Sequence, residues 1–265
     1  MFRTLAVFLF LTACSDDTTG KEHDDTATTE DSGSSEDSGS SEDSGSSDDT
    51  GEPGVQCDGD KVIESQADLD AIADCSTIAG NLQIISQEWL TTLTLPNLRE
   101  VEGFLEVNWN PNLTSFEMAQ LNTASKVLGI AHNSALTQFS LPALEYAKSV
   151  SINGNDVLPN VDGLATLQTV GEGFDGSADL RISSNPMLEN IDGLSGLTFV
   201  AGSIWLDDNY GLQSLNGLIE SQPAIGYSIY VRGNSALCQS DVDALFALYA
   251  ETDVSCNAQA NKEDC

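Results

Sequence analysis

Apolar residues recur in a fixed local pattern, apolar-x-apolar-x-x-Asn followed by Leu, from about residue 80 to residue 237. The spacings between successive Asn residues are 23, 22, 30, 24 and 25, which are typical coil lengths of a solenoid. An earlier copy, residues 82–87, has Gln at the Asn position. The six Asn residues of the pattern are Asn110, Asn133, Asn155, Asn185, Asn209 and Asn234.

Each copy predicts a short strand whose two apolar side chains point into a core, with the strand of the next coil alongside in parallel. One coil cannot bury its apolar face alone, so stacking supplies the core. We expect the Asn side chains to bond backbone groups where the chain turns, forming an internal structural ladder. Gly163, Gly193 and Gly217 each precede a Leu, which predicts a repeated backbone bend.

Short helices are expected at both ends of the repeats, where coils would otherwise expose apolar faces and strand edges. One begins at Ser65 as N-cap, and the other spans about residues 240–249. The expected fold is mainly β: a right-handed parallel β-helix or leucine-rich-type solenoid over residues 57–265, with capping helices and a disordered tether before it.

The N-terminus has the organisation of a signal peptide, with Arg3 followed by a short apolar run from Leu5 to Leu11. This run is too short to cross a bilayer as a helix. Residues 11–14, Leu-Thr-Ala-Cys, resemble the lipobox of bacterial lipoproteins, which implies cleavage after residue 13 and lipidation of Cys14. The alternative is an ordinary secretory signal with an incidental cysteine.

Residues 14–56 contain repeated Asp-Ser-Gly-Ser-Ser-Glu units and no aromatic residue, a composition that predicts a disordered tether. The repeats lack the ligand spacing of a calcium loop, so calcium capture is the weaker interpretation. The whole chain has 42 acidic and 9 Lys or Arg residues, a formal charge of −33 that argues against nucleic-acid binding. Residues 57–265 alone hold 28 acidic and seven basic residues, a net charge of −21.

Five cysteines flank the expected end helices, and an extracytoplasmic location permits disulfides. We expect Cys57 to pair with Cys75, and Cys238 to pair with Cys256 or Cys265. The odd number leaves one thiol unpaired, reactive or intermolecular. A zinc site is the competing interpretation, but no Cys-x2-Cys motif is present, so no metal or cofactor is expected.

Four features follow one another in the chain: a cysteine-flanked first helix, residues 78–84 (Ile-Ala-Gly-Asn-Leu-Gln-Ile), residues 93–103, and the Leu-x-Ile-x-x-Asn-x-x-Leu coils. Together they resemble the receptor L-domain family over about residues 57–238. The segment after residue 234 is similar to the ending of bacterial members. The resemblance implies a right-handed β-helix, a fold found in growth-factor receptors, fungal wall proteins and bacterial surface lipoproteins. Together with the signal ending at Cys14 it predicts a bacterial cell-envelope protein at the outer membrane, with surface exposure left open. The 30-residue coil containing residues 171–179 departs from the usual length and predicts a protruding loop.

No catalytic motif is present, since the chain lacks Gly-x-Ser-x-Gly, His-Glu-x-x-His and a phosphate-binding Gly-x4-Gly-Lys. Asp207 and Asp208 are adjacent acids, a feature of interest because some β-helix enzymes act on polysaccharides with carboxylates. Neighbouring strand residues point to opposite faces, however, so this pair cannot flank a glycosidic bond. We therefore predict that the protein is not an enzyme.

The outward positions of the strands form two rows, and their C-terminal part gathers aromatic and Arg side chains, which are enriched at interaction sites. The alternative is an ordinary surface with scattered aromatics. The sequence thus predicts a lipid-anchored envelope protein with a binding surface for protein or glycan. The alternatives are a passive structural lipoprotein and, least favoured, a polysaccharide-active enzyme. The candidate surface comprises Arg181, Trp205, Asp207, Tyr230 and Arg232.

Overall fold

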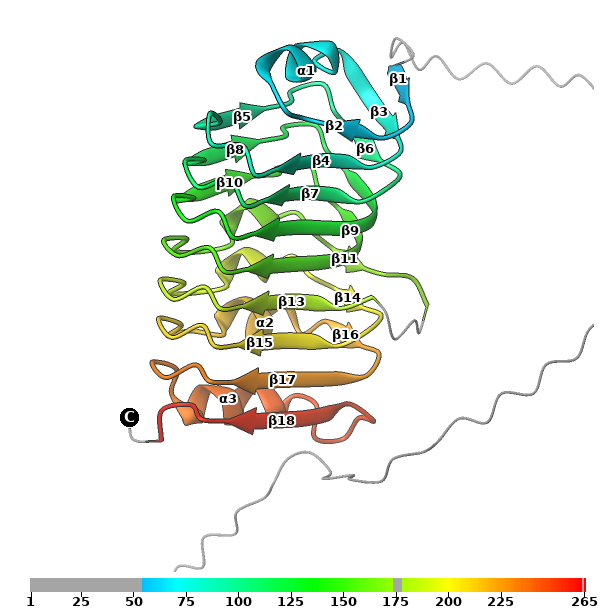
Figure 1. The fold of residues 1–265 in the computed structure, drawn as a ribbon. Coiled ribbons are helices and arrows are strands. Elements are labelled where there is room, and N and C mark those ends of the chain that lie inside the picture. The colour runs from blue at the N-terminus through cyan, green and yellow to red at the C-terminus, as the bar shows by residue number, and fades with distance from the viewer. Residues whose placement is uncertain (1–53, 174–177, 264) are drawn as a thin grey trace, which may run out of the picture.

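The computed structural model describes residues 54–173, 178–263 and 265, and these form a mainly β structure with a long parallel sheet and few helices (Figure 1). The strands of the described residues are β1 (Val55–Asp58), β2 (Lys61–Val62), β3 (Cys75–Ala79), β4 (Leu82–Ile85), β5 (Thr92–Thr94), β6 (Glu100–Val101), β7 (Leu105–Asn108), β8 (Ser115–Glu117), β9 (Thr123–Ala131), β10 (Gln138–Ser140), β11 (Tyr146–Asn153), β12 (Thr169–Val170), β13 (Leu180–Ser183), β14 (Phe199–Val200), β15 (Ile204–Asp207), β16 (Ala224–Ile225), β17 (Ser228–Arg232) and β18 (Ser255–Gln259). The helices are α1 (Gln66–Ala71), α2 (Asn216–Ser221) and α3 (Gln239–Ala247), and two 3₁₀ turns are η1 (Asp162–Leu164) and η2 (Asp192–Leu194).

The repeat pattern corresponds to one column of this sheet, in the order β2-β4-β7-β9-β11-β13-β15-β17-β18, which lies side by side down the molecule (Figure 1). Equivalent repeat residues are paired, as where Leu105 lies opposite Leu128 and Ile204 opposite Ile229. This arrangement is consistent with the expected solenoid.

Two long strands, β9 and β11, connect this column to a second one. Their first residues pair with short strands such as β6 and β12, and their last residues pair with β7 and β13. The register shifts between Ala147 and Ser149, where β11 passes from one column to the other.

A separate three-stranded parallel sheet, β10-β8-β5, forms a third side of the first coils. In later coils η1, η2 and α2 follow the Asn turn in place of these strands. The predicted bends at Gly163, Gly193 and Gly217 fall in these three elements. Glycine is needed there because neighbouring coils pack too closely for a side chain. A Cβ added at Gly193 would collide with the carbonyl of Val161, and one at Gly217 with that of Ile191 in the coil before.

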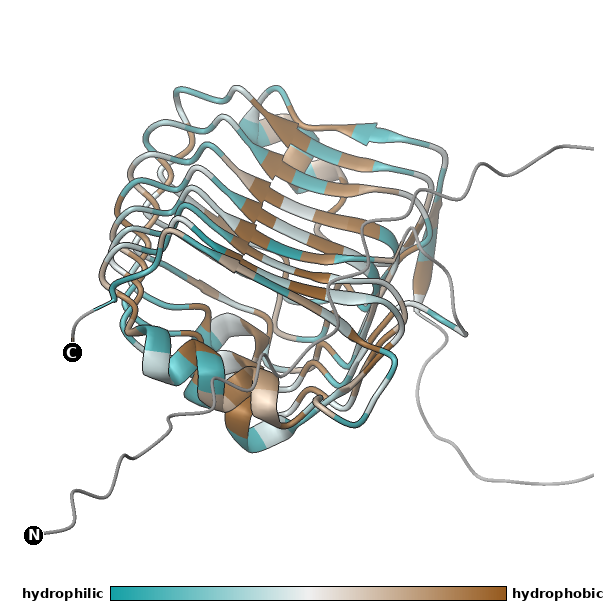
Figure 2. Ribbon diagram, turned by 90° about the horizontal axis from the view of Figure 1, so that it is seen from below, coloured by the Kyte–Doolittle hydropathy of each residue, from teal (hydrophilic) through white to brown (hydrophobic). Residues whose placement is uncertain are grey.

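The core is one continuous cluster of buried aliphatic side chains that extends through the coils. The strand residues Leu105, Val107, Leu128 and Ile130 are fully buried. Bands of hydrophobic residues continue from strand to strand when the molecule is viewed from below (Figure 2). Each coil therefore buries its apolar face against its neighbours, which is the source of stability in stacked repeats.

Each coil turns out of its first column through one residue with positive φ, directly before the Asn position. These residues have φ values of 55° to 68°, although only two of them are glycine. They are Ser86, Trp109, His132, Gly154, Ser184, Asp208, Gly233 and Ala260.

Helices α1 and α3 lie near the two ends of the described chain (Figure 1). Ser65 precedes α1 with extended backbone, but its hydroxyl donates a 2.8 Å hydrogen bond to Asp68 and does not bond a helical N–H. This bond and a backbone N–H lower the pKa of Asp68. In α3, Val242 and Leu245 are buried.

Two disulfides connect the cysteines at the ends of the domain. Cys57 bonds to Cys75, and Cys238 bonds to Cys265, which resolves the open choice between Cys256 and Cys265. None of the described cysteines, Cys256 included, is a free thiol. The expectation of one unpaired thiol among these five is therefore wrong.

Several predictions fall on residues outside the described ranges. They concern the signal peptide, the lipidated Cys14, the acidic tether up to residue 53 and the centre of the predicted loop at residues 174–177. Among the described residues, no helix has the length and apolar character needed to cross a membrane.

Candidate functional site

The five candidate surface residues come together on three adjacent strands, β13, β15 and β17. Arg181 lies opposite Trp205, and Trp205 lies opposite Tyr230, so these three form one row. Asp207 and Arg232 are paired in the next row, two residues further along their strands. The period of two in each strand and the parallel register place all five side chains on the outward face. We call these five residues the Arg–aromatic cluster.

The rings at the centre of the Arg–aromatic cluster are stacked. The ring centroids of Trp205 and Tyr230 are 3.8 Å apart, with planes inclined by 17°. The Arg181 guanidinium lies 4.4 Å from the Trp205 centroid, and the Arg232 guanidinium lies 5.1 Å from it and 4.9 Å from that of Tyr230. Such distances allow cation–π attraction, which favours one fixed arrangement of the four side chains.

Both guanidinium groups are also held by carboxylates. Arg232 donates from Nε and Nη2 to the two oxygens of Asp207, at 2.9 and 3.1 Å. These hydrogen bonds raise the pKa of Arg232. Arg181 donates from Nη2 to Asp179 at 2.9 Å, while half of its side chain stays exposed. The cluster is thus a preorganised surface in which the side chains of Arg181 and Arg232 remain 50% and 36% exposed.

Asp179 belongs to this site, although sequence reasoning did not select it. One of its oxygens accepts hydrogen bonds from Arg181 and from Nε1 of Trp205, and the other accepts the backbone N–H of Ser203. In the sequence, the one sign that Asp179 could belong to the site is its position two residues before Arg181, directly ahead of β13. Its role requires the coil-to-coil register, since Trp205 is 26 residues away.

The adjacent acids Asp207 and Asp208 have different surroundings in the structure. Asp207 is on β15 and is bonded to Arg232, whereas Asp208 is at the following turn with φ of 56°. Among the described residues, no cluster of three or more His, Cys, Asp or Glu side chains could hold a metal ion.

The six predicted ladder residues are fully buried and hydrogen-bonded from coil to coil. For example, Asn133 donates its N–H to Oδ1 of Asn155 at 3.1 Å, and Nδ2 of Asn155 donates to the carbonyl of Ile130 at 2.9 Å. Asn261, which lies outside the sequence repeat, forms a further rung by accepting the N–H of Asn234. Its strand, β18, has the small residues Cys256 and Ala258 at the two inward positions, and no Leu follows Asn261, so the pattern did not reveal it.

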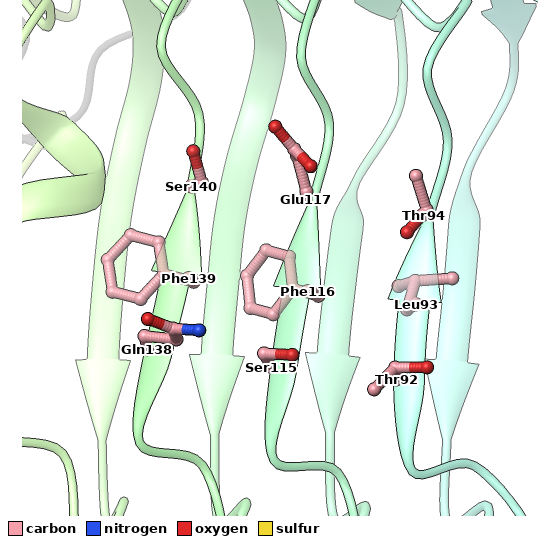
Figure 3. A pocket seen from close by; sticks show the side chains of 9 residues that line it. All are labelled: Thr92, Leu93, Thr94, Ser115, Phe116, Glu117, Gln138, Phe139 and Ser140. Carbon is pink, nitrogen blue, oxygen red and sulfur yellow. The ribbon is translucent and has the colours of Figure 1, made fainter.

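A second candidate surface is a shallow pocket of about 230 Å³ over β5, β8 and β10 (Figure 3). Leu93, Phe116 and Phe139 form its central row and are nearly buried, with the two Phe rings stacked at 5.5 Å. Polar residues flank this row on both sides, and Glu117 is the ionisable side chain among those that line the pocket. The sequence pattern did not indicate this pocket, because its short strands lie outside the Asn repeat.

Comparisons with known proteins give a family match for part of the chain. Residues 74–166, about a third of the chain, match the model of the Receptor L domain. Protein ecm33 of the fungus Aspergillus fumigatus is 28% identical over 113 residues, covering 43% of this chain and 27% of that protein. No solved structure gives a significant match.

The matched region includes the coils from β3 to η1 and ends before the Arg–aromatic cluster. It supports the L-domain part of the expected resemblance, whereas the relative is fungal and does not support a bacterial lipoprotein. The chain spans only about a quarter of that relative. Residues 74–166 are therefore similar to a Receptor L domain.

Proposed function

We propose that the protein is a lipid-anchored component of the cell envelope, and that its parallel sheet displays a non-catalytic binding surface for a protein or glycan. The Arg–aromatic cluster is the proposed site. The observation that carries the proposal is the assembly of two Arg and two aromatic side chains, from coils about 25 residues apart, into one stacked group on the surface.

Physical considerations support binding at this cluster. Trp, Tyr and Arg contribute most of the affinity at many interaction sites, because they provide large contact areas and several hydrogen bonds. Here stacking and the Asp partners already fix the side chains, so a ligand would cost little side-chain entropy. The similarity to a Receptor L domain supports a ligand-binding or structural role over a catalytic one.

The anchor is proposed from the sequence, since Cys14 follows a signal-like segment and would carry acyl chains as the mature N-terminus. More than one acyl chain gives stable membrane attachment. The acidic residues up to 56 would then separate the folded domain from the membrane. We also propose that the solenoid is right-handed and that α1 and α3 cap its ends, shielding the terminal apolar faces.

The binding proposal is tested with the full-length chain in detergent and a panel of probes: a neutral β-1,3-glucan, alginate, cytochrome c and serum albumin. We expect a probe to bind, and to bind at least about tenfold more weakly when Trp205→Ala and Tyr230→Ala are combined. Tyr210→Ala is the matched control, because Tyr210 is exposed at a turn outside the cluster. Equal binding by wild type and double variant, or no binding to any probe, overturns the site assignment.

The location is tested separately by treating intact cells with protease and following residues 57–265 by antibody. Release of the domain from intact cells supports surface display. Protection until the envelope is disrupted contradicts surface display and directs the search to periplasmic partners. Loss of acyl labelling in Cys14→Ser is the expected result for the anchor, and unchanged labelling would refute it.

A further inference from the structure

The face that carries the Arg–aromatic cluster is electrically balanced, unlike the rest of the domain. Two paired rows of outward residues, eight positions each, extend from β4 to β18. They contain two acidic and two Arg residues, a formal net charge of zero, whereas residues 57–265 together have −21. One row is Gln83, Glu106, Gly129, Ser151, Arg181, Trp205, Tyr230 and Asn257, and the other is Ile85, Asn108, Ala131, Asn153, Ser183, Asp207, Arg232 and Gln259.

The carboxylates in these rows already have partners within the protein. Glu106 accepts a 2.8 Å hydrogen bond from Gln83, and Asp207 is bonded to Arg232. Asp179, beside the rows, is bonded to Arg181. A charged partner would therefore have to compete with existing ion pairs, and an anionic one would also be repelled by the surrounding domain.

Gln83 and Asn108 are hydrogen-bonded within the protein, but several other uncharged polar side chains of this face are available to a ligand. Within the described part of the chain, the side chains of Ser151, Asn153, Asn257 and Gln259 make no hydrogen bond to protein, and neither does the Tyr230 hydroxyl. Amides and hydroxyls both donate and accept hydrogen bonds, as sugar hydroxyls do. Their balance of donors and acceptors matches a ligand rich in hydroxyl groups.

The geometry of the face favours a repeating, extended ligand. Parallel strands place equivalent side chains about 4.8 Å apart along the stack, a spacing comparable with the length of one sugar unit in an extended polysaccharide. The two faces of Trp205 are covered by Arg181 and Tyr230, so a ligand would meet the ring edges and guanidinium N–H groups of a rigid platform.

We infer that the ligand of this face is a neutral polysaccharide, which lies across β11 to β18 and contacts the Arg–aromatic cluster and the neighbouring amides. This inference rests on the proposed binding function and specifies its ligand class. A protein ligand would instead be expected to present charges that exchange with those of the cluster.

The test uses the full-length chain and three neutral linear glycans, a β-1,3-glucan, a β-1,4-glucan and an α-1,6-glucan, each beside its carboxymethylated derivative. We expect at least one neutral glycan to bind more tightly than its charged derivative, with affinity changing less than about twofold between low and high salt. Combining Trp205→Ala with Tyr230→Ala should weaken this binding at least about tenfold.

A second variant examines the face outside the cluster. Combining Asn153→Ala with Asn257→Ala should weaken neutral-glycan binding about threefold or more, because each removes hydrogen-bonding groups at the surface. Asn112→Ala is the control, since Asn112 is an exposed amide at a turn. Circular dichroism confirms that each variant is folded.

The outcomes separate this inference from the proposed function. Suppose that a carboxymethylated glycan or cytochrome c binds and needs Trp205 and Tyr230 for this, whereas neutral glycans do not bind. The inference of a neutral ligand then fails, while the proposed binding function stands. If Asn153 and Asn257 make no difference, the extended contact is wrong. If no probe depends on Trp205 and Tyr230, both proposals fail.

Discussion

Replacing Asn155 by alanine removes one rung of the Asn ladder in the middle of the stack. The change removes the acceptor of the buried Asn133 N–H, which is bonded to Oδ1 at 3.1 Å. It also removes the Nδ2 donor, at 2.9 Å, to the carbonyl of Ile130, which still lies in the pairing of β9 with β11. An orphaned buried polar group costs about 1–3 kcal/mol and a lost hydrogen bond about 1 kcal/mol, so the variant should lose about 2–4 kcal/mol of unfolding free energy. This loss is a large fraction of the stability of a typical domain.

The measurement is equilibrium unfolding in urea, followed by far-UV circular dichroism. The midpoint should fall while the slope against urea concentration stays constant, because the surface exposed on unfolding is unchanged. Asn112→Ala is the matched control, since Nδ2 of Asn112 donates a 2.7 Å hydrogen bond to the Glu88 carbonyl at an exposed site. There water replaces the lost bond, and we expect a cost below about 1 kcal/mol.

Equal losses for the two Asn variants would refute this reasoning. They would mean that the buried ladder contributes no more than a surface hydrogen bond, and that the packing of apolar side chains alone holds the turns in place. A loss of unfolding free energy confined to Asn155→Ala would instead establish that hydrogen bonds to the backbone groups at the turn are a main determinant of stability.

Three further predictions concern the turns, the C-terminal disulfide and a buried Tyr. Ser184→Gly should raise the unfolding free energy by about 0.5–1 kcal/mol, because φ is 55° at this position and glycine tolerates that conformation. Gly154→Ala, at φ of 65°, should lower the unfolding free energy by about 1–2 kcal/mol for the same reason. Changes of the same sign for the two variants in urea unfolding would contradict this. Replacing Cys238 and Cys265 by Ser should lower the unfolding free energy by about 3–4 kcal/mol, because the disulfide closes a loop with a sequence separation of 27. An unchanged melting temperature would refute this prediction. Burial raises the pKa of Tyr249 to about 12, above its unfolded value near 10, so its stabilising contribution is present below pH 10 and is lost as pH rises through 12. Tyr249→Phe should flatten the decline in stability between pH 10 and 12, and an equally steep decline would show that other groups cause it.

Much of the fold could be predicted from the sequence because its information is local and repeated. The alternation of Leu105 and Val107, followed by Asn110, defines a strand with one buried face and a turn. Repetition of this unit at near-constant spacing then aligns equivalent residues in rows. The rows that placed Trp205 beside Tyr230 follow from the same spacing.

Other features could not be read from the repeat, because they depend on contacts between coils. Trp109 and Asp208 occupy left-handed turn positions that favour glycine, and the coil geometry imposes that conformation on them. Gly193 is required by the approach of the preceding coil and not by its own backbone angles. Sequence reasoning attributed this glycine to a bend, since packing distance leaves no mark in the pattern.

The sequence by itself determined the coil unit, the buried Asn and the positions of the outward rows, since hydrophobic periodicity and hydrogen-bonding capacity are properties of each segment. Only the tertiary structure decided that Asp179 joins Trp205, that Cys238 pairs with Cys265, and that Arg181 covers the Trp205 ring. These choices depend on the path of the whole coil and on which side chains of successive coils meet. The repeat spacing aligns residues about 25 positions apart in rows, but it does not specify which of their side chains bond or stack.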